Sequence, residues 1–386
     1  MKRRIAFVQQ FSDKDWLGGK NYFSSLMNAI HAVAPDSIQM VLFTGHKITA
    51  ELPRELPFLD VVRTPLLDRR HPAWIGRQLM RSWYRLQHDP VFDRLLQRER
   101  IDLLSHTEPL VAARTSIKTL GWLPDFQFMH LPQFWSEKQI SATQRSYNTI
   151  VEHSDAVVVS SHHALHDLRH FAPASRTPAH VLHFIPSRVR FDGILSREQI
   201  NLKYDLPERY IHLPNQFWAH KNHGVVLEAL SQLKAAGSSA TVVCTGHTRD
   251  VRRPEYFDQL MARCRDLGLE NNFRVLGVVP YVDMQSLMLH AHAVLNPSKF
   301  EGWSTTVEEA KLMGKTIILS DIAVHREQAP ERGFYFALGD PQALATVLDA
   351  VQKQLPHPWS RDAIESRYGT ALMAFGKRYL SIINTL

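Results

Sequence analysis

The sequence predicts an α/β protein built from two doubly wound, Rossmann-like domains that face each other across a cleft. Three observations lead to this fold class. The chain of 386 residues is longer than an ordinary domain with one hydrophobic core. Short apolar segments alternate with helical stretches, and this alternation is interrupted near the middle of the chain. The apolar fraction of 44% and the charged fraction of 22% are typical of a folded protein rather than a disordered one.

In the first half of the chain, predicted strands alternate with predicted helices. Strands are predicted at "RIAFVQ", "IQMVLFTG", "IDLLSH", "IKTLGWLP" and "DAVVVSS", and "GGKNYFSSLMNAIHAVA" predicts a helix that follows two glycines. Such an order favours a parallel sheet with helices on both faces. We expect the first domain over residues 1–185.

The second half repeats the pattern after a connection rich in Pro, Ser and Arg between Phe171 and Arg197. Strands are predicted at "YIHLPN", "ATVVCTG", "FRVLGVV", "AVLNPS", "TIILS" and "GFYFA", separated by helical stretches around 222–235, 254–267, 283–292, 305–313 and 340–354. We expect the second domain over residues 195–360. A long amphipathic helix from about 364 to 386 is expected to return to the first domain.

The net charge of +7 implies an anionic partner, and the excess is concentrated. Nine arginines and four acids lie between Arg63 and Arg100, together with Trp74, Trp83 and Tyr84. This composition fits either a solvated helix pair or a surface that rests on an anionic membrane. Nucleic acid is not required as a partner, because the charge lies outside the motifs described below.

The expected location is cytoplasmic, at the inner face of the cell membrane where the basic surface would act. The chain has no apolar run near the ~18–20 residues of a membrane span. Its start lacks the apolar stretch and cleavage site of a secretory signal. Two cysteines, Cys244 and Cys264, do not make a disulfide framework.

The segment "EGWSTTVEEA" follows the predicted strand "AVLNPS" and opens a helix, with Ser304 or Thr305 as its N-cap. Phosphate suits the free amides of such a helix start. Glu301 and Glu309 would repel phosphate but can accept hydrogen bonds from hydroxyls. A sugar nucleotide has this layout, with a diphosphate between two hydroxylated rings. The alternative is that both glutamates only stabilise the helix electrostatically, and Glu308 is expected to be a solvent or packing residue.

Gly314-Lys315-Thr316 resembles the end of a phosphate loop but lacks the glycine five residues earlier and the helix that should follow. Gly314 is therefore predicted to end the preceding helix.

Three further segments follow predicted strands. In "LPNQFWAHKNHGVVLEAL", Asn222 or His223 would cap a helix and Lys221 would meet a diphosphate. Gly18 and Gly19 would let the backbone approach a ligand. In "GWLPDFQFMHLPQFWS", Asp125 and His130 suit acid–base work or sugar contacts, or belong to a packed loop.

Histidines 162, 166 and 170 share a helical face, and two could bind zinc at this spacing. No local acid or cysteine completes the set. We therefore expect exposed histidines on a helix capped by Ser160 or Ser161, and no metal.

"EGWSTTVEEA" resembles the Glu-x7-Glu motif of GT-B fold glycosyltransferases, in particular the retaining transferases of family four, and "NQFWxHKNH" resembles a bacterial polysaccharide and O-antigen subgroup. The resemblance covers nearly the whole chain and is strongest from about Tyr210 to Glu327. It implies that the first domain binds the acceptor and that the second binds a nucleotide sugar, without a cofactor or metal.

The resemblance also implies residue roles. Glu309 would bind the ribose hydroxyls, Glu301 would lie near those of the donor sugar, and residues 302–306 would approach the diphosphate. The family's usual Arg before Lys221 is missing here, and Gln216 or His220 would partly replace it. The expected donor set is Gly18, Gly19, Gln216, His220, Lys221, Gly246, Val278, Glu301, Gly302, Trp303, Ser304, Thr305 and Glu309; the catalytic set is Asp125, Lys221 and Glu301, with His130 on the acceptor.

The function expected from all of this is transfer of a hexose, with retention, from a UDP-, GDP- or dTDP-sugar to a glycan or lipid-linked acceptor. Two alternatives stay open. A sugar-nucleotide 2-epimerase would have a related fold, and a nucleotide-sugar binding protein would have no activity.

Overall fold

The computed structural model describes residues 2–9, 17–47, 52–83, 89–107, 116–355 and 357–386. The chain divides into two compact units. Unit 1 comprises residues 1–126, 137–187 and 370–386, and unit 2 comprises residues 127–136 and 188–369.

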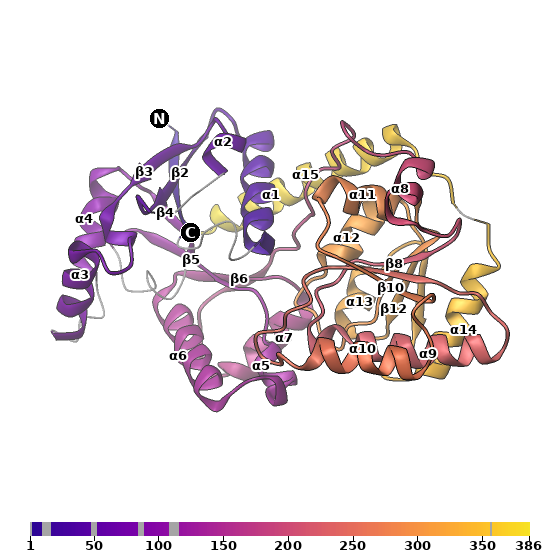
Figure 1. Ribbon diagram of the computed structural model, residues 1–386. Coiled ribbons are helices and arrows are strands. Elements are labelled where there is room, and N and C mark those ends of the chain that lie inside the picture. The colour runs from indigo at the N-terminus through magenta and orange to yellow at the C-terminus, as the bar shows by residue number, and fades with distance from the viewer. Residues whose placement is uncertain (1, 10–16, 48–51, 84–88, 108–115, 356) are drawn as a thin grey trace. The chain divides into compact units, whose positions relative to one another are not determined.

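Unit 1 is a seven-stranded parallel sheet in the order β3-β2-β1-β4-β5-β6-β7 (Figure 1). Its elements are β1 (Arg3–Gln9), α1 (Leu17–Val33), β2 (Ile38–Thr44), α2 (Leu52–Glu55), β3 (Asp60–Arg63), η1 (Pro65–Leu67), α3 (Pro72–Trp83), α4 (Pro90–Arg98), β4 (Leu103–Thr107), β5 (Lys118–Leu123), α6 (Glu137–His153), β6 (Ala156–Val159), α7 (His162–Phe171) and β7 (Ala179–Val181). The short strand β7 lies in the stretch for which the sequence predicted only a connection.

Unit 2 is a six-stranded parallel sheet in the order β10-β9-β8-β11-β12-β13. Its elements are α5 (Gln127–His130), η2 (Pro132–Phe134), α8 (Arg197–Tyr204), β8 (Ile211–Leu213), η3 (Ala219–Lys221), α9 (His223–Ala235), β9 (Val242–Thr245), α10 (Tyr256–Asp266), β10 (Phe273–Gly277), α11 (Tyr281–His290), β11 (Ala293–Asn296), α12 (Thr305–Leu312), β12 (Ile317–Ser320), α13 (Ala323–Gln328), β13 (Gly333–Phe336) and α14 (Pro341–Gln352). The strand order reverses between β8 and β11, and ligands bind beyond the strand ends at such a point.

Both faces of the unit 2 sheet are covered, which explains why its strands are nearly all apolar. Leu295 of β11 packs in one core with residues of α9, α10 and α14, while its neighbour Val294 packs in another core with α11 and α12. Successive side chains of a strand point to opposite faces, so a strand covered on both sides must be apolar throughout. This architecture confirms the predicted pair of doubly wound sheets.

The last helix, α15 (Arg361–Ile383), passes from unit 2 into unit 1, as the sequence predicted. Within unit 1, the hydroxyl of Tyr379 donates to Ser105 Oγ at 2.9 Å, and Arg3 Nη1 donates to the carbonyl oxygen of Ile383 at 2.9 Å. Gly376 lies against α1 so closely that an added Cβ would collide with the carbonyl oxygen of Ala29. The C-terminal helix is therefore an integral part of the N-terminal unit.

Candidate active site

The loop after β11 leads directly into α12, and Ser304 is its N-cap. Ser304 has extended backbone, and its Oγ accepts a hydrogen bond from the amide of Val307 at 3.4 Å. Gln328 fixes the cap further, because its Nε2 donates to the Ser304 carbonyl at 3.0 Å. The first-turn amides of a helix have no partners within the helix, so a capped helix start of this kind suits a phosphate.

Glu301 forms a buried ion pair with Lys221. Lys221 Nζ lies 2.7 Å from Glu301 Oε1, and the two side chains are only 14% and 9% exposed. Burial by itself would raise the pKa of Glu301, but the charge and the hydrogen bond of Lys221 hold the pKa below its usual value. Glu301 is therefore a carboxylate in a position to accept further hydrogen bonds.

An asparagine that the sequence analysis did not select organises this loop. Asn296 Nδ2 donates to Ser304 Oγ at 2.8 Å and is 3.4 Å from Glu301 Oε1, while its Oδ1 accepts from Asn215 Nδ2 at 3.0 Å. Asn215 in turn accepts from Thr306 Oγ1 at 3.2 Å. Buried amides at the ends of β8 and β11 thus join both loops, and the available signal was a polar residue at the end of each apolar strand.

Glu309 is buried in the first turns of α12, and its pKa is raised to about 7, mainly by desolvation. The hydroxyl of Tyr281 donates to Glu309 Oε1 at 3.0 Å and opposes that rise. Tyr281 is the first residue of α11 and was not predicted as a site residue. The carboxyl group already accepts one hydroxyl, which is the interaction that a ribose hydroxyl would make.

The loops after β9 and β10 meet at two glycines. Gly246 has φ +145, and an added Cβ would lie 2.5 Å from the carbonyl oxygen of Asn215. Its amide donates to the Gly277 carbonyl at 2.8 Å, and Val278 just beyond is 61% exposed. Gln216 Oε1 accepts from the amide of His247 at 2.7 Å. Gly246 and Val278, two residues of the expected donor set, therefore lie together with Gln216 along the strand ends.

His220 and His223 are buried beside Lys221, and desolvation lowers the pKa of each to about 3. Both imidazoles are therefore neutral at pH 7. Asn222 occupies the N-cap position of α9 but makes no capping bond with its side chain, whose Nδ2 donates instead to the Pro297 carbonyl at 3.2 Å. His220 therefore brings no positive charge to a phosphate, although a neutral imidazole still has one N–H group that can donate a hydrogen bond.

Two smaller predictions for α12 are confirmed. Glu308 packs against its neighbours, accepting from Gln328 Nε2 at 2.8 Å and from Lys311 Nζ at 3.0 Å. Gly314 has φ +65, and its amide donates to the Lys311 carbonyl at the end of the helix. The segment Gly314-Lys315-Thr316 therefore ends a helix and begins a strand.

The remaining predicted residues lie in other parts of the chain. Gly18 and Gly19 are in the first turn of α1 rather than in the loop before it, while residues 10–16 lie outside the described residues. Asp125 follows β5 in unit 1, and its carbonyl accepts from Tyr147 at 2.9 Å. His130 ends α5 in unit 2, with its ring 5.1 Å from that of Phe300.

Ser161 caps α7 by accepting from the Ala164 amide at 3.0 Å, as predicted. The rings of His166 and His170 lie 4.2 Å apart on that helix.

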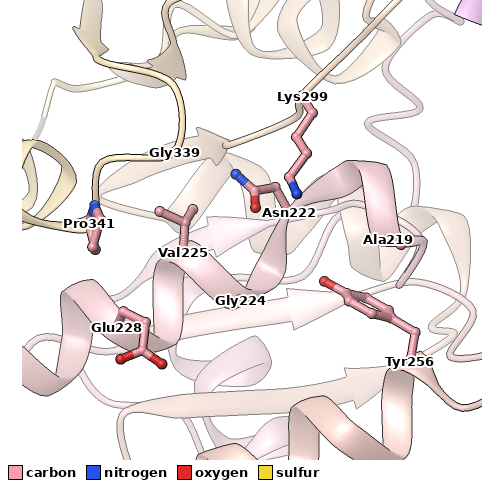
Figure 2. A pocket seen from close by; sticks show the side chains of 9 residues that line it. All are labelled: Ala219, Asn222, Gly224, Val225, Glu228, Tyr256, Lys299, Gly339 and Pro341. Carbon is pink, nitrogen blue, oxygen red and sulfur yellow. The ribbon is translucent and has the colours of Figure 1, made fainter. Parts of the chain in front are cut away.

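A cavity of about 350 Å³ lies at the start of α9 (Figure 2). Lys299 and Asn222 lie near one side, with Tyr256 and Glu228 below them (Figure 2). The lining residues are Ala219, Asn222, Gly224, Val225, Glu228, Tyr256, Lys299, Gly339 and Pro341. None of the predicted site residues is among them, so this cavity is distinct from the group around Glu301 and Glu309.

Among the described residues, no helix combines the length and the apolar character needed to cross a bilayer.

Part of the second half of the chain matches a known protein family. Residues 197–364 match the family Glycosyl transferases group 1. A comparison with curated protein sequences gives no match.

Solved structures of low identity share the fold. A glycosyltransferase from Rickettsia africae has 16% identity and a TM-score of 0.67, covering 99% of this chain and 97% of its own. Anabaena HepE, solved with UDP and glucose, has 15% identity and a TM-score of 0.69, covering 100% of both chains. WaaG, a glycosyltransferase of lipopolysaccharide biosynthesis, has 14% identity and a TM-score of 0.59, covering 97% and 95%. These structures show that the chain shares the GT-B fold of two Rossmann-like sheets, and the family match covers residues 197–364 of the chain.

Proposed function

We propose that the protein transfers a hexose from a nucleoside diphosphate sugar to a hydroxyl of a glycan or lipid-linked acceptor, in bacterial surface polysaccharide synthesis. The observation that carries the proposal is the arrangement around the start of α12. Glu301 with Lys221 lies in the loop before this helix, and Glu309 with Tyr281 lies one turn inside it. Two hydroxyl acceptors thus flank an anion-binding helix start, at the reversal point of the unit 2 sheet.

In this proposal the diphosphate meets the amides of residues 302–306, with Lys221 nearby. Glu309 accepts the ribose hydroxyls, Glu301 accepts hydroxyls of the sugar, and the base lies along Gly246 and Val278. Gly18 and Gly19 add first-turn amides of α1. That HepE was solved with UDP and with UDP-glucose supports a nucleotide sugar as donor.

The reaction breaks the bond between the anomeric carbon and the diphosphate oxygen and forms a bond to the acceptor oxygen. The acceptor proton passes to the leaving diphosphate, and the sugar keeps its configuration. Helix amides and Lys221 stabilise the charge that develops on the leaving group. Asp125 and His130 are assigned to the acceptor side, and residues 1–185 with the helix at 364–386 form the acceptor domain.

Binding of UDP, GDP and dTDP, followed by thermal shift, tests the donor assignment. One diphosphate should raise the melting temperature of the wild type, and Glu309→Ala should weaken its binding. Incubation of the matching nucleotide sugar without acceptor, followed by NMR, separates the alternatives. Appearance of a 2-epimer would support the epimerase, and binding without any turnover on lipid-linked acceptors would support a binding protein.

We also propose that unit 1 contacts an anionic membrane from the cytoplasmic side. Helix α3 exposes Ile75 (42%) and Leu79 (61%), one turn apart, and Arg69 and Arg70 are exposed just before it. An apolar strip beside cations suits a lipid surface. The arginines do not all contribute, because Arg77 is buried in an ion pair with Asp89 at 2.6 Å.

Tyr84 and the side chain of Trp83, which the sequence analysis added to this surface, lie outside the described residues. Flotation with vesicles tests the contact. Vesicles containing phosphatidylglycerol should retain the protein, pure phosphatidylcholine should not, and the double variant Ile75→Asp, Leu79→Asp should lose retention. Equal retention of wild type and variant would contradict the proposed membrane contact through α3.

A further inference from the structure

Two backbone amides remain for a phosphate in the first turn of α12. The Val307 amide donates to Ser304 Oγ, and the Glu308 amide donates to the Ser304 carbonyl at 3.2 Å. Within the described part of the chain, the amides of Thr305 and Thr306 donate to no protein acceptor. These two amides directly follow Ser304, so whatever holds Ser304 in place also sets the direction of the phosphate contacts.

Gln328, the last residue of α13, holds Ser304 from outside the helix. Its Oε1 accepts from the Ser304 amide at 3.4 Å, and its Nε2 donates to the Ser304 carbonyl at 3.0 Å. The second hydrogen of Nε2 goes to Glu308 Oε1 at 2.8 Å, and the side chain is buried at 2% exposure. One side chain thus fixes both backbone groups of the residue at which α12 begins.

The loop from Ser298 to Ser304 is also held at its other end by the segment that leads into α13. Ser320 Oγ, at the end of β12, donates to the Ser298 carbonyl at 2.6 Å. His325 Nδ1 donates to the Ser320 carbonyl at 2.8 Å, and burial keeps this imidazole neutral by lowering its pKa. The loop that carries Glu301 is therefore anchored at both ends by β12 and α13.

Gln328 also fixes the acid that follows the two amides. Glu308 Oε1 accepts from Gln328 Nε2 and, at 3.0 Å, from Lys311 Nζ. An ionised carboxylate near a helix N-terminus is attracted by the same positive potential as a phosphate, so its position affects anion binding there. The two donors keep the Glu308 carboxylate on the side of α12 that meets Gln328.

We infer that Gln328 is a positioning residue of the donor site, which holds the amides of Thr305 and Thr306 in place for the diphosphate. This inference rests on the proposed function. Both hydrogens of the Gln328 amide are used within the protein, so the residue acts through Ser304 rather than by touching the donor. A turn that is ordered before the donor arrives has less conformational freedom to lose on binding, which strengthens affinity.

The test compares Gln328→Met with Gln285→Met by calorimetry. Methionine keeps the approximate length and volume of glutamine and removes the hydrogen bonds of the amide. Gln285 of α11 is the matched control, because it is also buried, at 1% exposure, and also binds two backbone groups. Its Oε1 accepts from the Arg190 amide at 3.2 Å, and its Nε2 donates to the Arg188 carbonyl at 3.4 Å. These groups lie in the connection before α8 and not in the donor loop.

The ligands are whichever of UDP, GDP and dTDP the wild type binds, together with the matching nucleoside. Diphosphate affinity should fall about three- to tenfold in Gln328→Met, because ordering of the turn then accompanies binding. Nucleoside affinity should not change in this variant, and Gln285→Met should stay within about twofold of the wild type for both ligands. The midpoint of urea unfolding should fall in both variants, since each loses buried hydrogen bonds.

Three results would overturn the inference while leaving the proposed function in place. These are an unchanged diphosphate affinity in Gln328→Met, an equal loss for diphosphate and nucleoside, and an equal loss in Gln285→Met. The first would leave Gln328 a packing residue, the second would assign it to the structure of the whole unit, and the third would show a general effect of lost stability. Failure of the wild type to bind any of the three diphosphates would instead remove the proposed function together with this role.

Gln328→Asn covers the case in which the methionine variant does not fold. It keeps an amide but is one methylene shorter, so it cannot bind Ser304 and Glu308 as the glutamine does. Its loss of affinity should again be confined to the diphosphate. Wild-type affinity for the diphosphate, or an equal loss for the nucleoside, would contradict the positioning role.

Discussion

Glu309→Gln should make the protein more stable at pH 8 and less able to bind its donor. The carboxyl group is buried, and burial raises its pKa from 4.5 to about 7. In the unfolded chain the group loses its proton near its ordinary pKa, whereas the folded chain holds the proton up to about pH 7. Between these values the unfolded state binds fewer protons, so the free energy of unfolding falls as pH rises.

The size of the effect follows from the two pKa values. The destabilisation is absent below the unfolded pKa and complete above the folded one. At ~1.4 kcal/mol per pKa unit, it amounts to about 3 kcal/mol at pH 8 and about 1 kcal/mol at pH 5.5. Glutamine cannot ionise, yet its carbonyl oxygen can still accept the Tyr281 hydroxyl. The stability of Glu309→Gln relative to wild type should therefore rise by about 2 kcal/mol between pH 5.5 and pH 8.

Urea unfolding of the ligand-free protein at the two pH values measures this difference. Glu308→Gln is the control, because it changes the neighbouring carboxylate, which pairs with Lys311 one turn further along the same helix in an interaction worth a few tenths of a kcal/mol. It should show a small difference from wild type at both pH values. A relative stability of Glu309→Gln that does not rise with pH would refute the reasoning, whatever the effect on donor binding.

Three further outcomes are expected. Glu301→Gln should bind the bare nucleoside diphosphate at least as tightly as wild type, because Lys221 loses its competing partner. The same variant should transfer sugar at least tenfold more slowly. Loss of diphosphate binding, measured by calorimetry, would contradict the assignment of Glu301 to the hydroxyls of the sugar. Ser304→Ala should lower the free energy of unfolding by about 1 kcal/mol, because the N-cap of α12 is lost. An unchanged midpoint of urea unfolding would argue against a stabilising role of this cap. Gly376→Ala should destabilise the protein by roughly 1–3 kcal/mol, because the added Cβ would force α15 away from α1. Gly369→Ala is the control in the same helix: it has open space around it and should stabilise the protein by up to about 1 kcal/mol. Equal melting temperatures for the two variants would refute the packing argument.

The order of strands and helices could be predicted well because each depends on near neighbours in the chain. Parallel strands covered on both faces must be apolar, so "AVLN" and "IILS" stand out from their surroundings. The helix at 305–312 could be located from Ser304 before it and Gly314 after it. The strand β7 escaped prediction because its three residues, Ala179–Val181, are too few to show a period.

Other features depend on residues far apart in sequence. Tyr281 meets Glu309 across 28 positions, and Lys221 meets Glu301 across 80. From the sequence, Lys221 is expected on a phosphate and Glu301 near a sugar, but nothing along the chain indicates that the two side chains form an ion pair with each other. His220 likewise looks like a cation in the sequence and becomes neutral through burial.

By itself the sequence determined two Rossmann-like sheets, a helix start suited to phosphate after β11 and two glutamates beside it. These follow from periodicity, capping and spacing, which act over a few residues. Only the tertiary structure decided which of the charges are present and available. Desolvation keeps a proton on Glu309 up to about pH 7 and removes the one on His220, and folding pairs Lys221 with Glu301. Charge depends on burial and on neighbours in space, and neither can be read along the chain.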